Sequence, residues 1–407
     1  MKETTADAPY LADMVRVRSF RDVAAVLRAP TALQASHRES RDFYGDTLLL
    51  LDGDAHFARR RQEMPLFRRD ALLRYERGIL AGTIARTFDD TLAGGDDAGV
   101  VQADLVPMTH RILLEIAAAI VGFDDVDTAE RTARLSEIID ELAHAAHVEW
   151  ATTDRDAIIR RGLAFKQALV EEFQGPAWER RQAAAIPAED AADLLALLVT
   201  APPDDPDVVV RETILYLMAS TQTTTHALPH VIAELDSWEA SGRAPQGWRG
   251  DLELLKAACQ EAVRLHPPVP ALLREATADL DLPSGLTIRA GDRLALELAA
   301  ANNDPEVFGP EPQRFDPLRP LPSGIARHGV SFGGGIHTCI GRSLTVGLMS
   351  ETDPEADNLG MMLQLLQTFH AAGGRPDPDR PPRRNTASVQ DYYESFPVVF
   401  GPGGAAR

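Results

Sequence analysis

The sequence has few cysteines and no long apolar run, and these absences exclude several classes of protein. Two cysteines, Cys259 and Cys339, are too few for a disulfide framework. No stretch of about 18 or more apolar residues occurs, so we expect no membrane-spanning helix and no membrane partner. Residues 1–14 lack the apolar core of a secretory signal peptide. We therefore expect a soluble, cytoplasmic protein.

A surplus of basic residues is also absent. Lysine and arginine number 41 against 61 aspartates and glutamates, which gives the 407-residue chain a formal net charge of −20. This charge argues against a nucleic-acid-binding protein. No internal repeat, low-complexity tract or clean linker divides the chain, so we expect one domain spanning residues 1–407. With 44% hydrophobic residues, a domain of this size can enclose a sizeable ligand.

Apolar residues recur at helical spacing through most of the first 270 residues. The longest such segment predicts a helix over residues 208–237. Farther on, residues 279–298 show short apolar alternations separated by turn-forming residues, which predicts small strands and a hairpin. Residues 301–320 are dense in proline and turn formers and predict an ordered meander. The fold class that follows is mainly α with small β-sheets (α+β).

The predicted long helix contains an unusual run of hydroxyl side chains, with the sequence ASTQTTT from Ala219 to Thr225. Serine and threonine disfavour helix interiors because their hydroxyls compete for backbone hydrogen bonds and β-branching stiffens χ1. Pro229 adds an expected kink or break. A run that costs helix stability in this way indicates a polar function for this part of the helix, although the run also fits a cap for a kink at Pro229.

The segment Ser331–Leu344, SFGGGIHTCIGRSL, places one cysteine inside a glycine-rich loop. Glycines allow positive φ and close backbone approach, so they can aim backbone N–H groups at a sulfur. We expect a helix over residues 340–349, which would put Cys339 near a helix N-terminus that favours an anion. A single soft ligand fits zinc poorly, but it fits haem iron, where the porphyrin supplies the other four donors. The alternative is a buried cysteine in a glycine turn.

The residues Phe332, Gly333, Gly335, His337, Cys339 and Gly341 resemble the haem-binding signature of the cytochrome P450 family in identity and spacing. The resemblance implies the cytochrome P450 fold, with haem b (iron protoporphyrin IX) between a long central distal helix and a proximal Cys loop. It implies that Cys339 is the iron ligand and that the other five residues help to bind the cofactor.

Other parts of the chain match family positions in the expected order. Glu261 and Arg264 match a Glu-x-x-Arg pair, which the resemblance places in a buried ion-pair cluster with Arg319 of the meander. The haem propionates need cationic partners. The family positions for these partners correspond here to His56, Arg60, Arg274 and His337. Arg60 also fits one of three adjacent surface arginines.

On the distal side, the family's Ala-Gly-x-Asp/Glu-Thr-Thr pattern corresponds to residues 219–224. The resemblance implies that Thr223 donates a hydrogen bond at the oxygen site, with Thr224 one position away as the alternative. Two positions depart from the pattern, because Ser220 replaces the glycine and Gln222 replaces the acid. An amide cannot relay protons as a carboxylate does. We expect Thr223, Gln222 and Ser220 to be the catalytic positions.

The resemblance implies a monooxygenase that activates dioxygen to oxidise a small organic substrate, of a kind found in secondary metabolism. Electrons would come from a separate ferredoxin and ferredoxin reductase, because no flavin or iron–sulfur segment is present, and we expect a monomer. Gln222 leaves open atypical chemistry: peroxide-driven turnover, desaturation, coupling or ring formation. A non-catalytic haem-binding or sensor protein is a further alternative, against which the Thr223 hydroxyl counts.

Three remaining features lie outside this pattern. An acidic, proline-containing insertion around residues 350–360 interrupts the helix expected after the cysteine, and it is either a loop excursion or an altered docking surface for a redox partner. Cys259 is expected to be a core residue. His226 and His230 are four residues apart but lack a third ligand, so we expect structural roles for both rather than metal binding.

Overall fold

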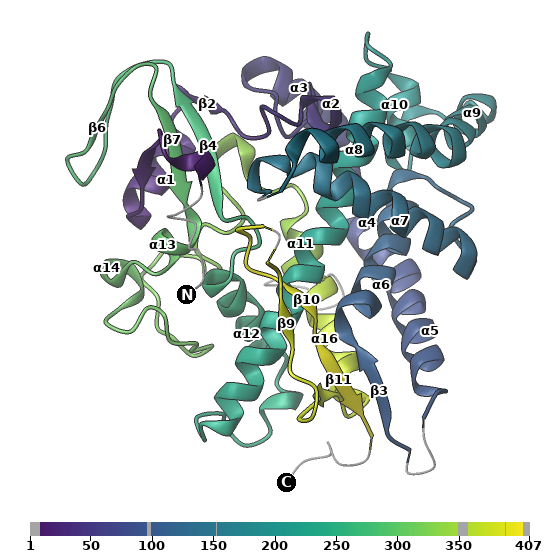
Figure 1. Ribbon diagram of the computed structural model, residues 1–407, viewed down its shortest axis with the longest axis vertical. Helices are drawn as coiled ribbons and strands as arrows, with labels where there is room; N and C mark the ends of the chain where they lie inside the picture. The colour runs from purple at the N-terminus through teal and green to yellow at the C-terminus, as the bar shows by residue number, and fades with distance from the viewer. Residues whose placement is uncertain (1–8, 96–98, 152, 349–356, 387, 402–407) are drawn as a thin grey trace.

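The computed structural model describes residues 9–95, 99–151, 153–348, 357–386 and 388–401. Helices form most of the molecule, and one small sheet lies to the left of them in Figure 1 while another lies at the C-terminal edge. The helices are α1 Phe20–Arg28, α2 Arg41–Tyr44, α3 Gly53–Glu63, α4 Arg69–Arg74, α5 Ala81–Leu92, α6 Leu105–Val121, α7 Ala129–Ala146, α8 Arg155–Leu169, α9 Gly175–Ala184, α10 Leu194–Thr200, α11 Asp207–Ala240, α12 Leu252–Leu265, α13 Leu298–Asn302, α14 Pro305–Phe308, α15 Arg342–Val346 and α16 Met361–Ala371.

The strands are short and form four separate sheets among the described residues. They are β1 Val15–Val17, β2 Ala32–Gln34, β3 Val101–Asp104, β4 Ala271–Ala276, β5 Leu280–Asp281, β6 Thr287–Ile288, β7 Arg293–Glu297, β8 Arg375–Pro376, β9 Arg383–Arg384, β10 Tyr393–Ser395 and β11 Pro397–Phe400. The expected class, mainly α with small sheets, is confirmed.

The long central helix α11 runs through the middle of the molecule and packs against α6 and α12 (Figure 1). It begins at Asp207 and ends at Ala240, close to the expected bounds. Residues on nearly every side of it are buried, as expected for a helix enclosed by others. The expected break at Pro229 does not occur, because the helix continues through this residue. Its hydroxyl run therefore lies in the interior of the domain rather than at a helix end.

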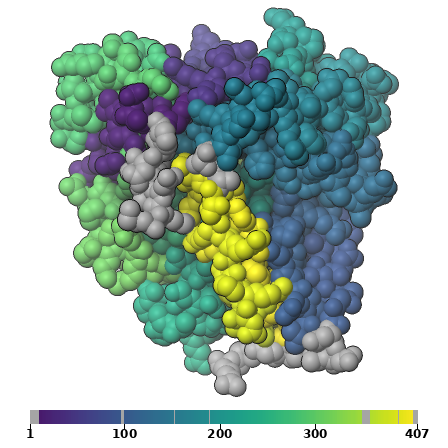
Figure 2. Space-filling view, viewed as in Figure 1, coloured from purple at the N-terminus to yellow at the C-terminus, as the bar shows by residue number. Residues whose placement is uncertain are grey.

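The largest sheet has the order β1-β7-β4-β2, with β1 parallel to β7 and the other pairs antiparallel. Strands β5 and β6 form the hairpin expected within residues 279–298. Strand β11 pairs with both β3 and β8, so the end of the chain joins its first third. In Figure 2 the C-terminal segment, in yellow, lies at the surface between the blue part of the chain on the right and the green and teal parts on the left.

The chain after Cys339 departs from the expected helix over residues 340–349. Helix α15 ends at Val346, because Gly347 adopts φ 80° and a Cβ there would lie 2.5 Å from the carbonyl oxygen of Leu359. Leu348 then pairs with Asn358 in an isolated bridge, and α16 follows. The predicted interruption is thus confirmed, and residues 349–356 of the insertion lie outside the described residues. No helix in the described parts of the chain is both long and apolar enough to cross a bilayer.

Candidate active site

A cavity of about 1210 Å³ separates α11 from the glycine-rich cysteine loop. Ala219, Thr223 and Thr224 line it from α11, and Phe332 and Cys339 line it from the loop. The structure therefore brings together two segments that lie far apart in the sequence. The remaining predicted site residues that line this cavity are Ser220, Gln222, His56, Arg60, Arg274, His337, Gly333 and Gly341.

The cysteine loop folds tightly because of its glycines. Gly333 and Gly335 both have positive φ, 67° and 64°. A Cβ on Gly335 would lie 2.1 Å from the carbonyl oxygen of Leu27, so only glycine fits there. The Cys339 N–H donates to the Phe332 carbonyl at 2.9 Å, which closes the loop. The Cys339 side chain is exposed and lines the cavity.

Two opposing effects act on the ionisation of the Cys339 thiol. Burial raises the pKa of the Cys339 thiol, while the backbone N–H of Gly341 and the charge of Arg60 act in the opposite direction. Backbone N–H groups aimed at the sulfur are what a metal-bound thiolate needs. A positive metal centre next to the sulfur would lower the pKa of the Cys339 thiol and keep the sulfur ionised.

The three charged residues expected to pair do form one buried cluster. Arg264 binds both carboxylate oxygens of Glu261 at 2.8 Å, and Arg319 binds the same carboxylate at 3.1 Å. Glu261 and Arg264 are 0% exposed and Arg319 is 6% exposed. The guanidinium groups also donate to the carbonyl oxygens of Asn302 and Phe308. Because every partner is satisfied, the charges are tolerated in the interior, and the cluster fixes α12 against the meander.

Four cationic or imidazole groups converge at one side of the cavity with too little negative charge to balance them. Among the described residues no carboxylate lies within ion-pair distance of the buried Arg274, and burial lowers its pKa to about 10. Burial, followed by the charges of His337 and Arg60, lowers the pKa of His56 to about 4. The His56 Nδ1 is buried without a hydrogen bond. A cofactor with two carboxylates would neutralise this cluster, so these residues fit haem propionates.

The sequence analysis missed one member of this cluster, Asp52. Its carboxylate accepts from the His337 Nε2 at 2.9 Å and from the Gln34 N–H at 2.9 Å. Burial raises the pKa of Asp52, but these two hydrogen bonds outweigh burial and hold it below its usual range. Asp52 directly precedes α3 and lies four positions before His56, so spacing on one helical turn was the available signal.

The hydroxyl side chains of the run on α11 differ in exposure. The Thr223 hydroxyl is half-buried and bonds the Ala219 carbonyl oxygen at 3.0 Å. Thr221 is buried and bonds the Leu217 carbonyl oxygen at 2.8 Å. Thr224 is 2% exposed. The greater exposure of Thr223 favours it over Thr224 as the hydroxyl available to a bound ligand.

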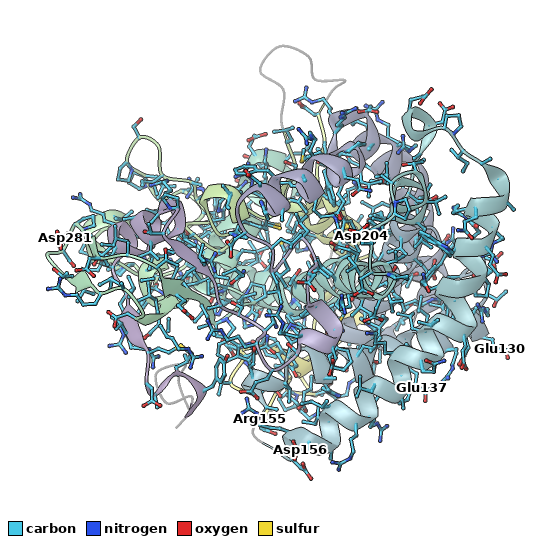
Figure 3. The ribbon with its side chains drawn as sticks, turned by 90° about the horizontal axis from the view of Figure 1, so that it is seen from above. Glu130, Glu137, Arg155, Asp156, Asp204 and Asp281 are labelled. Carbon is cyan, nitrogen blue, oxygen red and sulfur yellow. The ribbon has the colours of Figure 1, made fainter. Side chains whose placement is uncertain are left out.

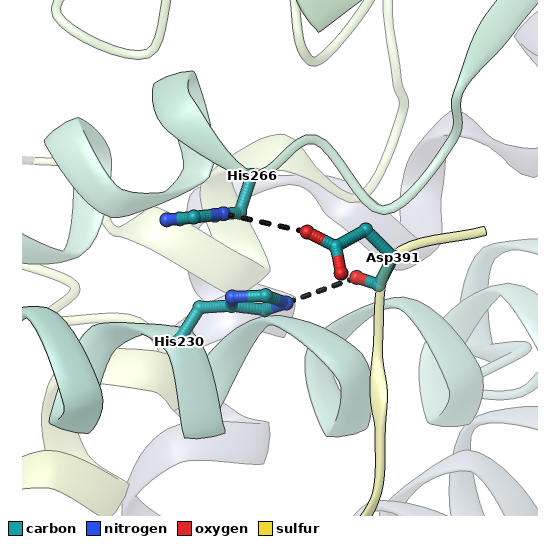
Figure 4. Close-up of side chains that lie close together, drawn as sticks. All are labelled: His230, His266 and Asp391. Atoms are coloured by element: carbon teal, nitrogen blue, oxygen red, sulfur yellow. Dashed lines mark hydrogen bonds and ion pairs between the residues drawn. The ribbon is translucent and has the colours of Figure 1, made fainter. Parts of the chain in front are cut away.

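The two α11 histidines have partners within the protein. His226 stacks on Tyr392, with ring centroids 4.0 Å apart. His230 meets His266 and Asp391 in the cluster drawn in Figure 4, and its Nε2 lies 2.9 Å from the Asp391 carbonyl oxygen. These three groups are close enough to hold a metal ion, but the Asp391 carboxylate pairs with Arg384 at 2.7 Å.

His266 is likewise engaged, because its Nε2 lies 2.8 Å from a carboxylate oxygen of Glu234. The donors of the His230, His266 and Asp391 cluster therefore already bond one another or neighbouring charges, which supports the expected structural role. Cys259, on α12, is 2% exposed, and burial raises its pKa to about 12. It belongs to the core, as expected.

The family model for cytochrome P450 matches residues 13–349 of the chain. A steroid C26-monooxygenase of Mycolicibacterium smegmatis is 32% identical over 226 residues, which cover 53% of this chain and 49% of that protein. The chain thus spans about half the length of this relative. A cyclooctat-9-en-7-ol 5-monooxygenase of Streptomyces melanosporofaciens is 27% identical over 76% of this chain and 71% of that protein.

Solved structures agree with the fold. The crystal structure of CalO2 superposes with a TM-score of 0.74, at 21% identity, over 98% of this chain and 96% of that one. P450BioI in complex with a fatty-acid-ligated acyl carrier protein gives a TM-score of 0.74, at 19% identity, over 95% and 92%. The family's cofactor is haem b, and the cavity has the sulfur and the cationic groups that this cofactor requires. The chain belongs to the cytochrome P450 family.

Proposed function

We propose that the protein is a haem-thiolate monooxygenase that oxidises a small organic substrate with dioxygen, as enzymes of secondary metabolism do. The observation that carries this proposal is the cavity itself, which the Cys339 sulfur and the Thr223 hydroxyl line from opposite sides. In the overall reaction one oxygen atom enters the substrate and the other leaves as water, with two electrons and two protons consumed. The chain must therefore position a substrate and deliver protons.

The residues of the cavity divide into those that would hold the cofactor and those that act above it. Cys339 would hold the iron, and His56, Arg60, Arg274 and His337 would hold the propionates. When bound, haem b supplies an iron centre for dioxygen, and its thiolate ligand donates electron density that favours O–O cleavage. The remaining cofactor contacts would come from Phe332, Gly333 and Gly341 of the loop. The predicted Gly335 does not line the cavity and instead lets the loop pack against Leu27 of α1.

Above the cofactor, small and hydroxyl side chains leave room and supply hydrogen bonds. Ala219 and Ser220 line the cavity where a larger side chain would fill it. The Thr223 hydroxyl can exchange its bond to the Ala219 carbonyl for one donated into the cavity. Gln222 offers an amide at the position of the family's acid, and it cannot release a proton.

The part of the cavity lined by α2 and the end of α7 supports an uncharged substrate that carries polar groups. His37, Tyr44 and His147 line it beside apolar side chains. Burial lowers the pKa of His37 and of His147 to about 4, so both rings are neutral hydrogen-bonding groups at pH 7. Oxygenated terpenoids have this mixed character. The name of the Streptomyces relative, a cyclooctat-9-en-7-ol 5-monooxygenase, is in line with such a substrate.

Electrons would reach the cofactor through the face that carries the cysteine loop, from a ferredoxin reduced by its reductase. Gly341 packs beside Phe67, whose ring lies 3.9 Å from the position of a Cβ on Gly341. Arg68, the next residue after Phe67, is exposed. An exposed cation beside the loop supports docking of an acidic iron–sulfur protein. A monomer would suffice for this reaction.

Gln222 favours a second candidate, in which the same cofactor performs desaturation, coupling or ring formation, or uses peroxide. With peroxide, the two protons and two electrons arrive with the oxidant. Desaturation, coupling and ring formation driven by dioxygen consume two electrons and two protons as hydroxylation does, but both oxygen atoms then leave as water. Labelled dioxygen separates the two candidates. Turnover with electron donor and ¹⁸O₂ should give product that contains one ¹⁸O atom. Oxidised product without the label would contradict the monooxygenase and favour the atypical chemistry.

A further inference from the structure

The distal helix lacks an acid where proton delivery needs one, yet a carboxylate reaches the same place from another helix. Residues Ala133, Ser136, Asp140, Ala143 and His147 line the cavity. Their spacing alternates between three and four, so they share one face of α7 or follow directly from its end. This face is turned to the cavity. Asp140 is therefore a cavity residue, although 55% of its side chain is exposed.

One flank of α7, beside the cavity face, is turned to the outside. Glu130 and Glu137 are exposed, are absent from the cavity lining and lie at the outer edge of the molecule in Figure 3. Glu137 pairs with Arg134 on the same helix at 2.6 Å. Glu137 thus provides a matched comparison, since it is an acid on the same helix that has no access to the cavity.

Asp140 lies near the residue that replaces the family's acid. Gln222 and Asp140 both line the cavity, and the Gln222 amide acts to lower the pKa of the Asp140 carboxyl. The Nε2 of His110, on α6, lies 3.7 Å from Oδ1 of the same carboxylate and has no hydrogen-bond partner. The His110 Nδ1 lies 3.2 Å from the Ser136 hydroxyl. Polar side chains from three helices, α6, α7 and α11, therefore line the cavity together.

Asp140 is the more accessible member of the Asp140–His110 pair. Its side chain is 55% exposed and can exchange protons with water in contact with it, while His110 is 12% exposed. Burial raises the pKa of Asp140, and the charges of His110 and His144 and the Gln222 amide oppose this. Burial lowers the pKa of His110, and Asp140 opposes this. The two pKa values therefore move toward each other, which suits proton transfer between the groups.

The other charged groups near the pair come from the helices packed around it. His144 and Glu141 lie on α7. His226 lies on α11, and burial together with the charge of His110 lowers its pKa. Arg161 on α8 pairs with Glu141, which leaves Glu141 compensated. None of these groups bonds Gln222 among the described residues. Asp140 and His110 are thus the titratable pair best placed to act at this position.

We propose that Asp140, coupled to His110, carries protons into the distal cavity in place of the acid missing at position 222, and that Gln222 positions Asp140. This inference rests on the proposed monooxygenase function. A proton passes from the Asp140–His110 pair to water in the cavity beside Thr223. The ionised pair then takes a proton from water in contact with Asp140, so no other reactant is needed.

The coupling is tested first by NMR, without turnover. The His110 ring of the haem-loaded, reduced, carbon-monoxide-bound protein is titrated in the wild type, in Asp140→Asn and in the control Glu137→Gln. Removal of the facing carboxylate should lower the pKa of His110 in Asp140→Asn, and the control should leave it unchanged. An unchanged His110 titration in Asp140→Asn would overturn the proposed pair.

Proton delivery is tested by the fate of electrons. With dioxygen and electron donor, Asp140→Asn should lose about 10- to 100-fold in product formation and should release hydrogen peroxide instead. With added hydrogen peroxide, which brings its own protons, product formation should stay near the wild-type rate. Asp140→Glu should restore part of the dioxygen-driven rate, and Glu137→Gln should match the wild type.

Three results separate the outcomes. Equal dioxygen-driven product formation and peroxide release in Asp140→Asn and wild type would overturn the proton role and leave the monooxygenase intact. A wild type that forms no product from dioxygen with any electron donor, while its carbon monoxide spectrum is that of a thiolate haem, would instead contradict the proposed function. A parallel loss of peroxide-driven and dioxygen-driven turnover in a folded Asp140→Asn protein would assign Asp140 to substrate binding and likewise overturn the inference.

Discussion

The two sides of the cavity differ in how closely they keep the family's pattern. On the proximal side, the cysteine loop and the Glu261, Arg264 and Arg319 cluster match it in residue type and in geometry. On the distal side, Ser220 and Gln222 replace two of its characteristic residues. In the proposed function the proximal side would fix a cofactor, which requires one geometry. The distal side would deliver protons and hold a substrate, and these tasks could be met from a neighbouring helix.

The sulfur on the proximal side should show the largest effect. Cys339→Ser should abolish product formation, a loss of at least about 10⁴-fold, because an alcohol does not replace a thiolate ligand. Steady-state turnover with electron donor measures this. The matched control is Cys259→Ala, the other cysteine, which should keep the wild-type rate. Turnover near wild type in Cys339→Ser would remove the basis for the proximal site.

The buried ion-pair cluster should show the next largest effect, on stability. Glu261→Gln leaves two buried guanidinium groups without their shared carboxylate, so the free energy of unfolding should fall by about 3–5 kcal/mol. Urea denaturation measures it. Glu253→Gln, at an exposed position of the same helix α12, should change stability by less than about 1 kcal/mol. Equal effects of the two substitutions would contradict the bracing role.

The propionate partners should show an intermediate effect, on cofactor retention. Arg274→Met removes a buried cation that has no carboxylate within ion-pair distance among the described residues, so haem should dissociate about 10- to 100-fold more readily. Transfer of haem to an acceptor protein gives the rate. Arg289→Met, on the exposed β5–β6 hairpin, is the control and should match the wild type. Unchanged retention in Arg274→Met would remove Arg274 from the haem site.

The smallest effect belongs to the distal hydroxyls and decides between two of them. Thr223→Val should divert electrons to hydrogen peroxide and lower product formation by about 10-fold. Thr224→Val, which changes a buried side chain, should have little effect on the ratio of product to peroxide. Both quantities are measured in one oxidase assay. The reverse ranking would place Thr224 above the cofactor.

The proximal side could be predicted from the sequence because its signals are local. Glu261 and Arg264 share one helical turn, and the glycines lie within a few residues of Cys339. The shape of the loop follows from positive φ at glycine, which a sequence pattern records directly. The helix expected after the cysteine was too long, because the turn at Gly347 depends on the returning chain near Leu359.

The distal side could be predicted only in part, because its partners come from other helices. The sequence indicated the hydroxyl run and the missing acid at 222, but not Asp140 or His110, whose meeting depends on how α6, α7 and α11 pack. Asp52 was missed for the same reason, since its contact with His337 joins distant segments. Periodicity predicts which face of a helix is buried, not which polar side chain on another helix meets it.

The central claim, that the Cys339 thiolate binds haem iron, has one most direct measurement. The haem-loaded protein is reduced, carbon monoxide is added, and the Soret band is recorded. Thiolate ligation predicts a strongly red-shifted band that disappears in Cys339→Ser and persists in Cys259→Ala. A band of the histidine-ligated kind in the folded wild type, or a red-shifted band that survives in Cys339→Ser, would contradict it.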